Sequence, residues 1–152
     1  MGRVLALVCA AALLWVTVGG TMSKADAQYI CSPMSGVLIG PDGAPAAGVA
    51  VRREWSYNNK NGTDRVATDS NGAFGFGAVE APRKGWFSGL STPVVLQRYY
   101  AEFGGQDVEI LYISSRSLDP LHETGGAAFA VTCDLRQEPG NTSLGWGQCT
   151  LN

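Results

Sequence analysis

The sequence predicts an all-β fold, a two-layer β-sandwich of about seven to eight antiparallel strands. The apolar segments after residue 27 are short, and Gly, Pro, Asn or Asp, the residues typical of turns, stand at their ends. Several segments alternate apolar and polar residues with a period of two, as a strand with one buried face does. No segment keeps a helical period over a long stretch, so the pattern favours strands throughout.

The N-terminus has the three parts of an export signal. Arg3 gives a positive start, residues 4–18 form an apolar run, and Ala25-Asp26-Ala27 fits the small-x-small cleavage pattern. The apolar run is shorter than the roughly 20 residues that a membrane-spanning helix needs. We therefore expect residues 1–27 to be a signal peptide, cleaved after Ala27, and residues 28–152 to form one periplasmic or secreted domain.

The charge of the domain excludes two classes of partner. Residues 28–152 carry 9 Lys and Arg and 12 Asp and Glu, without a run of basic residues. Nucleic acids and anionic lipids attract clustered positive charge. We therefore expect neither nucleic acid nor a membrane surface as a partner.

The first half contains four expected strands, at residues 35–40, 48–57, 64–69 and 73–77. Pro41-Asp42-Gly43 predicts a hairpin-like bend after the first strand, because proline presets φ and glycine supplies a positive φ. Residues 58–63 are expected to form a polar loop. Ser70-Asn71-Gly72 predicts a turn between the third and fourth strands.

The second half contains four more expected strands, at residues 95–103, 107–114, 129–135 and 144–151. Gly104-Gly105 predicts a hairpin between the first two of them. In that hairpin Arg98 and Glu102 have the opposite parity to the apolar positions, which indicates a face turned to water. Apolar residues at positions 108, 110 and 112 are expected to line the buried face.

Three cysteines remain after signal cleavage, so one internal disulfide at most can form. Cys133 and Cys149 stand almost symmetrically about the turn signal Pro139-Gly140-Asn141, and a hairpin there would place them opposite one another. We therefore predict a Cys133–Cys149 disulfide and a free Cys31. Pairing of Cys31 with either of the other two cysteines is the alternative.

Residues 35–79 carry a set of short motifs that recurs in one known family. They are Ser35-Gly36-Val37, Asp42-Gly43-x-Pro45, Gly48-Val49-x-Val51, Thr68-Asp69, Gly72, Phe74, Phe76 and Val79. With them the segment resembles the start of carboxypeptidase regulatory-like domains. That resemblance implies a transthyretin-like, or prealbumin-like, β-sandwich.

The second half is similar to a bacterial family of exported domains of unknown function. The motifs that carry the similarity are Thr92-Pro93 leading to Gln97, Phe103-Gly104-Gly105, Cys133-Asp134-Leu135 and Gly147-Gln148-Cys149. This resemblance implies an immunity protein or an accessory partner of a secreted antibacterial effector.

His122 is the only histidine, so a catalytic triad could be built in only one way. Its neighbourhood, residues 119–123, has no nucleophile-elbow pattern, and we expect a solvated loop histidine. Transthyretin-related hydrolases end in Tyr-Arg-Gly-Ser, whereas residues 149–152 read Cys-Thr-Leu-Asn. We therefore expect no enzymatic activity, with an enzyme built around His122 as a minor alternative.

We expect no metal or cofactor. The three cysteines and His122 lack the Cys-x₂₋₄-Cys spacing of a zinc site. Asp69-x-Asn71-Gly72 resembles the opening of a calcium loop, but Glu80 is out of register for the last ligand, and a β-turn explains the motif. The carboxylates of Glu102, Asp107 and Glu109 are expected to be solvent-facing charges at a sheet edge, not a glycosidase pair.

Long loops and exposed aromatic residues indicate where a partner would bind. Residues 81–93 and 115–126 are expected to be long surface loops, which often carry function. The candidate contact residues are Arg83, Lys84, Trp86 and Phe87 in the first loop, together with Trp55 and Tyr57 at the end of a strand. For Trp55 and Tyr57 the alternative is that they close one end of the sandwich.

These observations lead to two functional hypotheses. The leading one is an exported, non-enzymatic domain that binds another protein, and the resemblance implies a periplasmic immunity protein that neutralises a secreted toxin. The alternative is a carbohydrate- or envelope-binding module that uses Trp55 and Tyr57 as stacking platforms.

Overall fold

The chain forms an all-β sandwich, as the sequence predicts. A computed structural model describes residues 27–82 and 91–152, so the expected signal peptide, except its last residue, lies outside the described residues. The two described ranges contain twelve strands in three sheets and no helix. Consequently neither range contains a helix that could cross a membrane.

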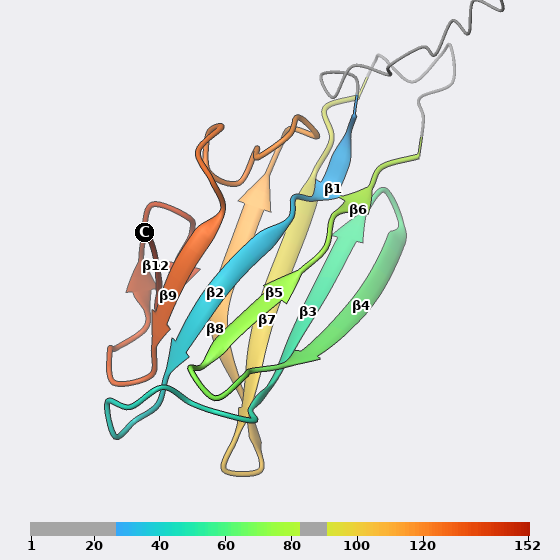
Figure 1. Ribbon diagram of the computed structural model, residues 1–152. Helices are drawn as coiled ribbons and strands as arrows, with labels where there is room; N and C mark the ends of the chain where they lie inside the picture. The colour runs from blue at the N-terminus through green and yellow to red at the C-terminus, as the bar shows by residue number, and fades with distance from the viewer. Residues whose placement is uncertain (1–26, 83–90) are drawn as a thin grey trace, which may run out of the picture.

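The larger layer is a six-stranded sheet (Figure 1). Its strands, in spatial order, are β10 (Gly140–Asn141), β11 (Trp146–Gly147), β8 (Gln106–Ser115), β7 (Val95–Phe103), β3 (Ala50–Tyr57) and β4 (Lys60–Ala67). All neighbours in this sheet are antiparallel.

The second layer is a four-stranded sheet that packs against the first (Figure 1). Its order is β12 (Cys149–Leu151), β9 (Ala130–Asp134), β2 (Met34–Ile39) and β5 (Ala73–Phe76). A small third sheet pairs β1 (Tyr29–Cys31) with β6 (Val79–Glu80) at one end of the sandwich.

The main core lies between the two layers. Val51, Tyr99 and Leu111 of the larger sheet and Leu38 and Val131 of the smaller sheet are all fully buried in one cluster. Inward side chains of this kind alternate with outward polar ones along each strand, which is the pattern of a sandwich. Burial of these apolar side chains is the main source of stability, at roughly 25 cal/mol per Å².

Seven of the described strands have four or more residues, in agreement with the expected number. One pairing differs from the expectation, because β2 and β9 are parallel. A hairpin forces antiparallel pairing, but β9 follows a long connection from β8 in the opposite sheet. Its direction is therefore not fixed by a turn.

The two expected turns of the first half are present, but they join different sheets. Gly72 has a φ of +73°, and its N–H donates to the Asp69 carbonyl at 3.0 Å, which makes the expected turn. It leads from β4 to β5, and the bend at residues 41–43 leads from β2 to β3. The hairpin-like bend at residues 41–43 is confirmed, because Ile39 pairs with Pro45 across it in an antiparallel bridge, and the chain crosses to the other layer after it.

The expectation of a polar loop at residues 58–63 is wrong. Asn58 and Asn59 alone form the turn, with φ values of +49° and +63°, and Lys60 already pairs with Tyr57. Asparagine tolerates the left-handed region, so two successive asparagines suit this tight turn. The polar residues that follow belong to β4, an edge strand with little apolar content.

A register shift changes the orientation of Tyr112. Tyr99 pairs with Leu111 and Tyr100 pairs with Glu109, so Ile110 is the extra residue of a bulge. Ile110 and Leu111 are consequently both buried, and alternation beyond them is reversed. Tyr112 was expected on the buried face and instead lies on the outer one.

The expected last strand, residues 144–151, is divided between the two layers. Its first part is β11, which pairs with β10 and β8, and its second part is β12, which pairs with β9. Gly147 has a φ of +146°, a conformation that only glycine adopts readily. The chain therefore changes sheets at this glycine.

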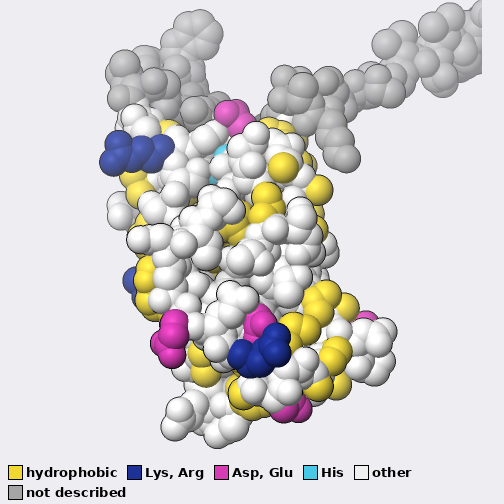
Figure 2. Space-filling view, turned by 90° about the vertical axis from the view of Figure 1, so that its left-hand side faces the viewer, with side chains coloured by type: hydrophobic (Ala, Val, Ile, Leu, Met, Phe, Trp, Pro, Cys, Tyr) yellow, Lys and Arg dark blue, Asp and Glu magenta, His cyan; other side chains and the backbone are white. Residues whose placement is uncertain are grey.

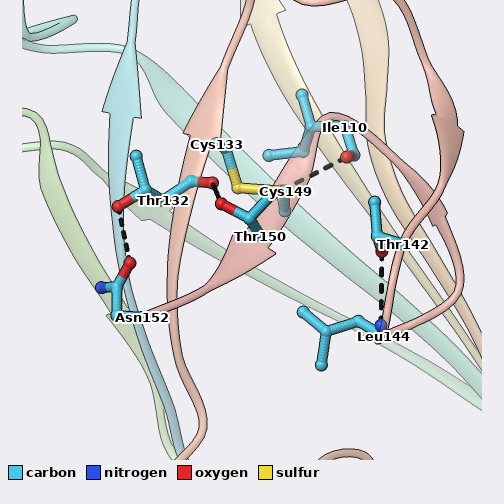
Figure 3. The surroundings of a disulfide bond; sticks show 8 residues. All are labelled: Ile110, Thr132, Cys133, Thr142, Leu144, Cys149, Thr150 and Asn152. Atoms are coloured by element: carbon cyan, nitrogen blue, oxygen red, sulfur yellow. Dashed lines mark hydrogen bonds between the residues drawn. A yellow bond between two sulfur atoms is a disulfide. The ribbon is translucent and has the colours of Figure 1, made fainter.

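The Cys133–Cys149 disulfide is confirmed, and Figure 3 shows its surroundings. Cys133 and Cys149 are direct cross-strand partners in β9 and β12, and both are fully buried. Beside them the Thr132 hydroxyl donates to the Asn152 amide oxygen at 2.8 Å. Cys31 is free and fully buried.

Candidate functional site

The face of the six-stranded sheet that turns away from the smaller sheet is exposed to solvent, and we call it the outer face. Val51 and Arg53 point inward and are at most 1% exposed. Side chains alternate along a strand, so Arg52 and Glu54 point outward. The same alternation and the pairing register place a partner from every strand beside them.

One row of outward side chains crosses all six strands. Each residue is the cross-strand partner of the next, in the order Asn141, Trp146, Tyr112, Arg98, Glu54 and Thr63. Trp146 is 41% exposed, and the Arg98 guanidinium lies 5.1 Å from the centre of the Tyr112 ring. We call this set the aromatic row. It presents a large, partly exposed aromatic surface beside charged groups.

Ion pairs cover the outer face next to the aromatic row. Arg52 lies 2.9 Å from Asp107 and 3.0 Å from Glu54, and its guanidinium stacks 4.7 Å from the centre of the Tyr100 ring. Hydrogen bonding to Asp107 raises the pKa of Arg52. Positive and negative side chains alternate here, so neither sign of charge dominates the electrostatic potential of this surface.

The carboxylates considered as a glycosidase pair belong to this network. Glu102 pairs with Arg65, and Glu109 lies 3.1 Å from Arg98. They face solvent as expected, but they stand on β7 and β8 in the middle of the sheet and not at an edge. On the side of the molecule in Figure 2, charges of both signs are likewise scattered among uncharged groups.

A hollow of about 410 Å³ opens on the outer face beside the edge strand β4. It is lined by Glu54, Trp55, Ser56, Asn61, Gly62, Thr63, Leu96 and Arg98. Most of these side chains share the outward parity and offer hydroxyl, amide, carboxylate and guanidinium groups around one leucine. The hollow can therefore hold a polar group through hydrogen bonds.

Trp55 and Tyr57 point to the inner side of the sheet. Both are half-buried and pack against a second small core of Ile30, Cys31, Val95 and Leu118. The Trp55 indole lies across Gly62 of the neighbouring strand, where a Cβ would overlap the ring. This packing agrees with the alternative that they close the end of the sandwich, and their contact with a partner stays a prediction.

The other four candidate contact residues, Arg83, Lys84, Trp86 and Phe87, lie outside the described residues. Their role in binding also stays a prediction.

The expected surface loop at residues 115–126 is partly buried, and the solvated His122 is a wrong prediction. The His122 side chain is 1% exposed, and its Nε2 lies 3.4 Å from the Glu123 carboxylate, whose side chain is also buried. The loop folds back onto the N-terminal segment, because Leu121 donates its N–H to the Ser32 hydroxyl at 2.9 Å. Sequence alone does not indicate this long-range contact.

Glu123 organises a buried polar cluster beside β1. One of its carboxylate oxygens accepts hydrogen bonds from the Ser32 N–H and the Gln97 amide, each at 2.8 Å. The Tyr99 hydroxyl donates to the Gln97 amide oxygen at 2.7 Å. Because buried polar groups need partners, this cluster fixes the loop, β1 and β7 relative to one another.

Cys31 borders this cluster and does not have the properties of a nucleophile. Burial raises the pKa of its thiol to about 12, so the reactive thiolate is scarce at neutral pH.

The groups considered as metal ligands have other partners. The disulfide uses two of the three thiols that a Cys₃His zinc site would require. The Asp69 carboxylate accepts the N–H groups of Asn71 and Ala73 at 2.8 and 2.9 Å, as a turn aspartate does. Within the described ranges, no cluster of three or more His, Cys, Asp or Glu residues could hold a metal ion.

Comparison with known proteins assigns the chain to a family. The family described as a domain of unknown function, DUF6795, matches residues 34–138. The chain belongs to this family. The match runs from the start of β2 to beyond β9 and so includes most of both sheets. No curated protein and no solved structure matches the chain.

Sequence reasoning missed the aromatic row, and one local signal could have indicated part of it. Trp146 stands between Gly145 and Gly147, which have φ values of +152° and +146°. A Cβ at either glycine would overlap the backbone of β8. Two glycines around a tryptophan therefore allow close pairing with β8 and leave the indole on the outer face.

Proposed function

We propose that the domain is an exported, non-enzymatic binding module that contacts another protein through the outer face. The observation that carries this proposal is the aromatic row, in which a 41% exposed Trp146 stands beside Tyr112 and Arg98. Tryptophan, tyrosine and arginine are the residues that most often dominate the energy of protein interfaces.

The charges of the outer face favour a protein over a polyanion as the partner. Arg52, Arg65 and Arg98 are each paired with a carboxylate on the same face. A polyanion would need unpaired positive charge, whereas a protein surface can match alternating charges residue by residue. The buried disulfide is compatible with a periplasmic or extracellular location.

We propose further that the partner is a secreted antibacterial effector, which the domain would neutralise as a periplasmic immunity protein. The similarity of the Cys133-Asp134-Leu135 and Gly147-Gln148-Cys149 motifs to exported domains supports it. In the same way, the motifs of residues 35–79 support assignment of the sandwich to the transthyretin-like kind.

A carbohydrate- or envelope-binding module is the second candidate. The hollow favours it, because Ser56, Asn61 and Thr63 offer hydroxyl and amide groups close to the aromatic row. Polyhydroxylated ligands are bound by such groups together with aromatic faces. Glycan-array binding that Trp146→Ser abolishes would support this candidate over a protein partner.

The test of the proposal uses cross-linking of the exported protein in the organism that produces it. Trp146→Ser should lose the cross-linked protein partner, because the substitution removes the exposed aromatic surface. Val94 is the matched control, since it is 52% exposed and lies outside the aromatic row. Identical partners for Trp146→Ser, Val94→Ser and the unchanged protein would show that the outer face is not the contact surface.

A further inference from the structure

We propose that the edge strand β4 binds an extended segment of the partner protein as an additional strand, and that the hollow receives one of its side chains. This inference rests on the proposed function, because it specifies how a protein partner reaches the outer face. The site lies at the β4 end of the aromatic row, where Thr63, Glu54 and Arg98 line the hollow, whereas Trp146 lies toward the opposite edge of the sheet.

β4 is the long free edge of the sandwich. It has eight residues and pairs only with β3 among the described strands. The other edges of the two main sheets are β10 with two residues, β12 with three and β5 with four. An exposed edge strand offers unpaired N–H and C=O groups to another chain.

The pairing register shows which groups of β4 are free. The Thr68 N–H donates to the Val49 carbonyl at 2.9 Å, so the main chain of residue 68 is directed at β3. Hydrogen-bonded pairs recur at every second residue, which places the main-chain groups of residues 61, 63, 65 and 67 on the side away from β3. All four residues are exposed.

β4 lacks two of the features that commonly block an edge, proline and a bulge, and its inward charge, Asp64, is already paired with Arg53. Its pairing with β3 continues over all eight residues without a bulge, and it contains no proline. Its lysine, Lys60, stands next to the turn at the beginning of the strand. Edges that must not bind another strand are usually interrupted by proline, bulges or inward charges.

The surroundings of β4 offer contacts on both sides of an added strand. In strand addition, main-chain hydrogen bonds give affinity, and pockets for alternate side chains give specificity. On the outer side, Asn61 and Thr63 line the hollow, which suits a polar side chain. On the inner side, the half-buried Trp55 indole lies across Gly62 and suits an apolar side chain.

The hollow favours a segment of another protein over a second copy of β4. In a β4–β4 pair, the side chains offered to the hollow would be those of β4 itself. Asn61 and Thr63 are short, and Arg65 is already paired with Glu102. None of them is both long and unpaired, so none would reach into the hollow. The occupant is therefore an extended, proline-free segment with a polar and an apolar side chain on opposite faces.

The test compares two substitutions at Thr63 in the exported, oxidised protein. The Thr63 N–H points away from β3, so Thr63→Pro removes a donor for the added strand and keeps the β3–β4 pairing. Thr63→Val removes the hydroxyl that lines the hollow but keeps the N–H and the β-branched shape, so the difference between the two variants isolates the main-chain donor. The probe is an immobilised library of proline-free peptides of strand length, followed by affinity measurement on the peptides that bind.

We expect Thr63→Val to bind the same peptides as the unchanged protein with a modest loss of affinity, and Thr63→Pro to bind them about tenfold more weakly than Thr63→Val or worse. Hydrogen exchange at the amides of residues 63 and 65 should slow when peptide binds. Unchanged affinity of Thr63→Pro, or the absence of any bound peptide, would overturn the inference. A dimer that Thr63→Pro dissolves would also overturn it, because the occupant would then be a second copy.

The same variants separate this inference from the proposed function. Loss of the cross-linked partner in Trp146→Ser but not in Thr63→Pro would leave the proposed function intact and refute strand addition. Loss in Thr63→Pro but not in Trp146→Ser would place the contact at β4 and not at the Trp146 end of the aromatic row.

Discussion

The buried Arg53 gives the sharpest stability prediction. Its side chain is 1% exposed, stacks 4.8 Å from the centre of the Phe76 ring, and donates its Nε–H to Asp64 at 3.1 Å and an Nη2–H to the Gly77 carbonyl at 3.0 Å. The remaining nitrogen, Nη1, is buried and has no hydrogen-bond partner among residues 27–82 and 91–152. Asp64→Ala would therefore leave a buried positive charge without its counter-ion.

The expected cost follows from the exposure of the two groups. Removal of one partner of a fully buried pair costs about 3–5 kcal/mol. The Asp64 side chain is 41% exposed, so water screens part of the pair, and we expect Asp64→Ala to cost about 2–3 kcal/mol. Arg53→Met removes the charge together with its unpaired nitrogen. Arg53→Met should change the free energy of unfolding by less than about 1 kcal/mol, because methionine can fill the space against Phe76.

Urea unfolding followed by tryptophan fluorescence measures both effects, with the double variant completing a mutant cycle. The double variant Arg53→Met/Asp64→Ala should recover most of the stability lost in Asp64→Ala. The reasoning would be refuted by a loss below about 1 kcal/mol in Asp64→Ala, or by a double variant as unstable as Asp64→Ala alone.

Three further predictions concern the core. Replacement of both Cys133 and Cys149 by alanine should lower the free energy of unfolding by about 3 kcal/mol, because the disulfide closes a loop with a sequence separation of 16. Urea unfolding measures this loss, and a loss near zero would contradict the prediction. Burial raises the pKa of Cys31 from 9.0 to about 12, so the folded state keeps a proton that the unfolded chain releases. Stability should consequently fall as the pH rises from 9 toward 12, and Cys31→Ala should show a smaller fall in the same assay. Gly36→Ala should destabilise by about 1–3 kcal/mol, because its Cβ would overlap the Phe74 ring on the neighbouring strand, and a melting temperature equal to that of the unchanged protein would refute this.

The sequence predicts the strands well wherever one face of a strand is buried. Residues 95–103 alternate cleanly, and the structure gives β7 the same bounds. The Cys133–Cys149 disulfide was predicted correctly, but the turn used for it was misplaced, because Gly140–Asn141 form β10 and the chain reverses at residues 142–145. The first half of β4, residues 60–63, was the exception, since an edge strand with exposed polar residues has no apolar alternation to indicate it.

The layer that each strand joins was not predictable in the same way. A turn such as Ser70-Asn71-Gly72 shows that the chain reverses, but not whether the next strand pairs with the previous one or crosses to the other sheet. The bulge at Ile110 also depends on pairing between strands, and it reverses the orientation of Tyr112. The burial of His122 depends on a contact with Ser32, about ninety residues away.

The aromatic row could not be predicted because register alone assembles it. Glu54 and Trp146 belong to the same row although they are far apart in the sequence. A shift of one residue in any pairing would turn a side chain to the opposite face. Such a site therefore becomes visible only when the pairing of all six strands is known.

The parallel pairing of β2 with β9 has a consequence for the order of folding. The first long strand of the domain lies directly beside one of the last, and the disulfide then attaches β12 to β9. The smaller layer cannot close until almost the whole polypeptide is available for folding, and contacts between such distant segments form slowly. Completion of the sandwich is thus delayed until nearly the whole domain is available, which is compatible with the export proposed for this protein.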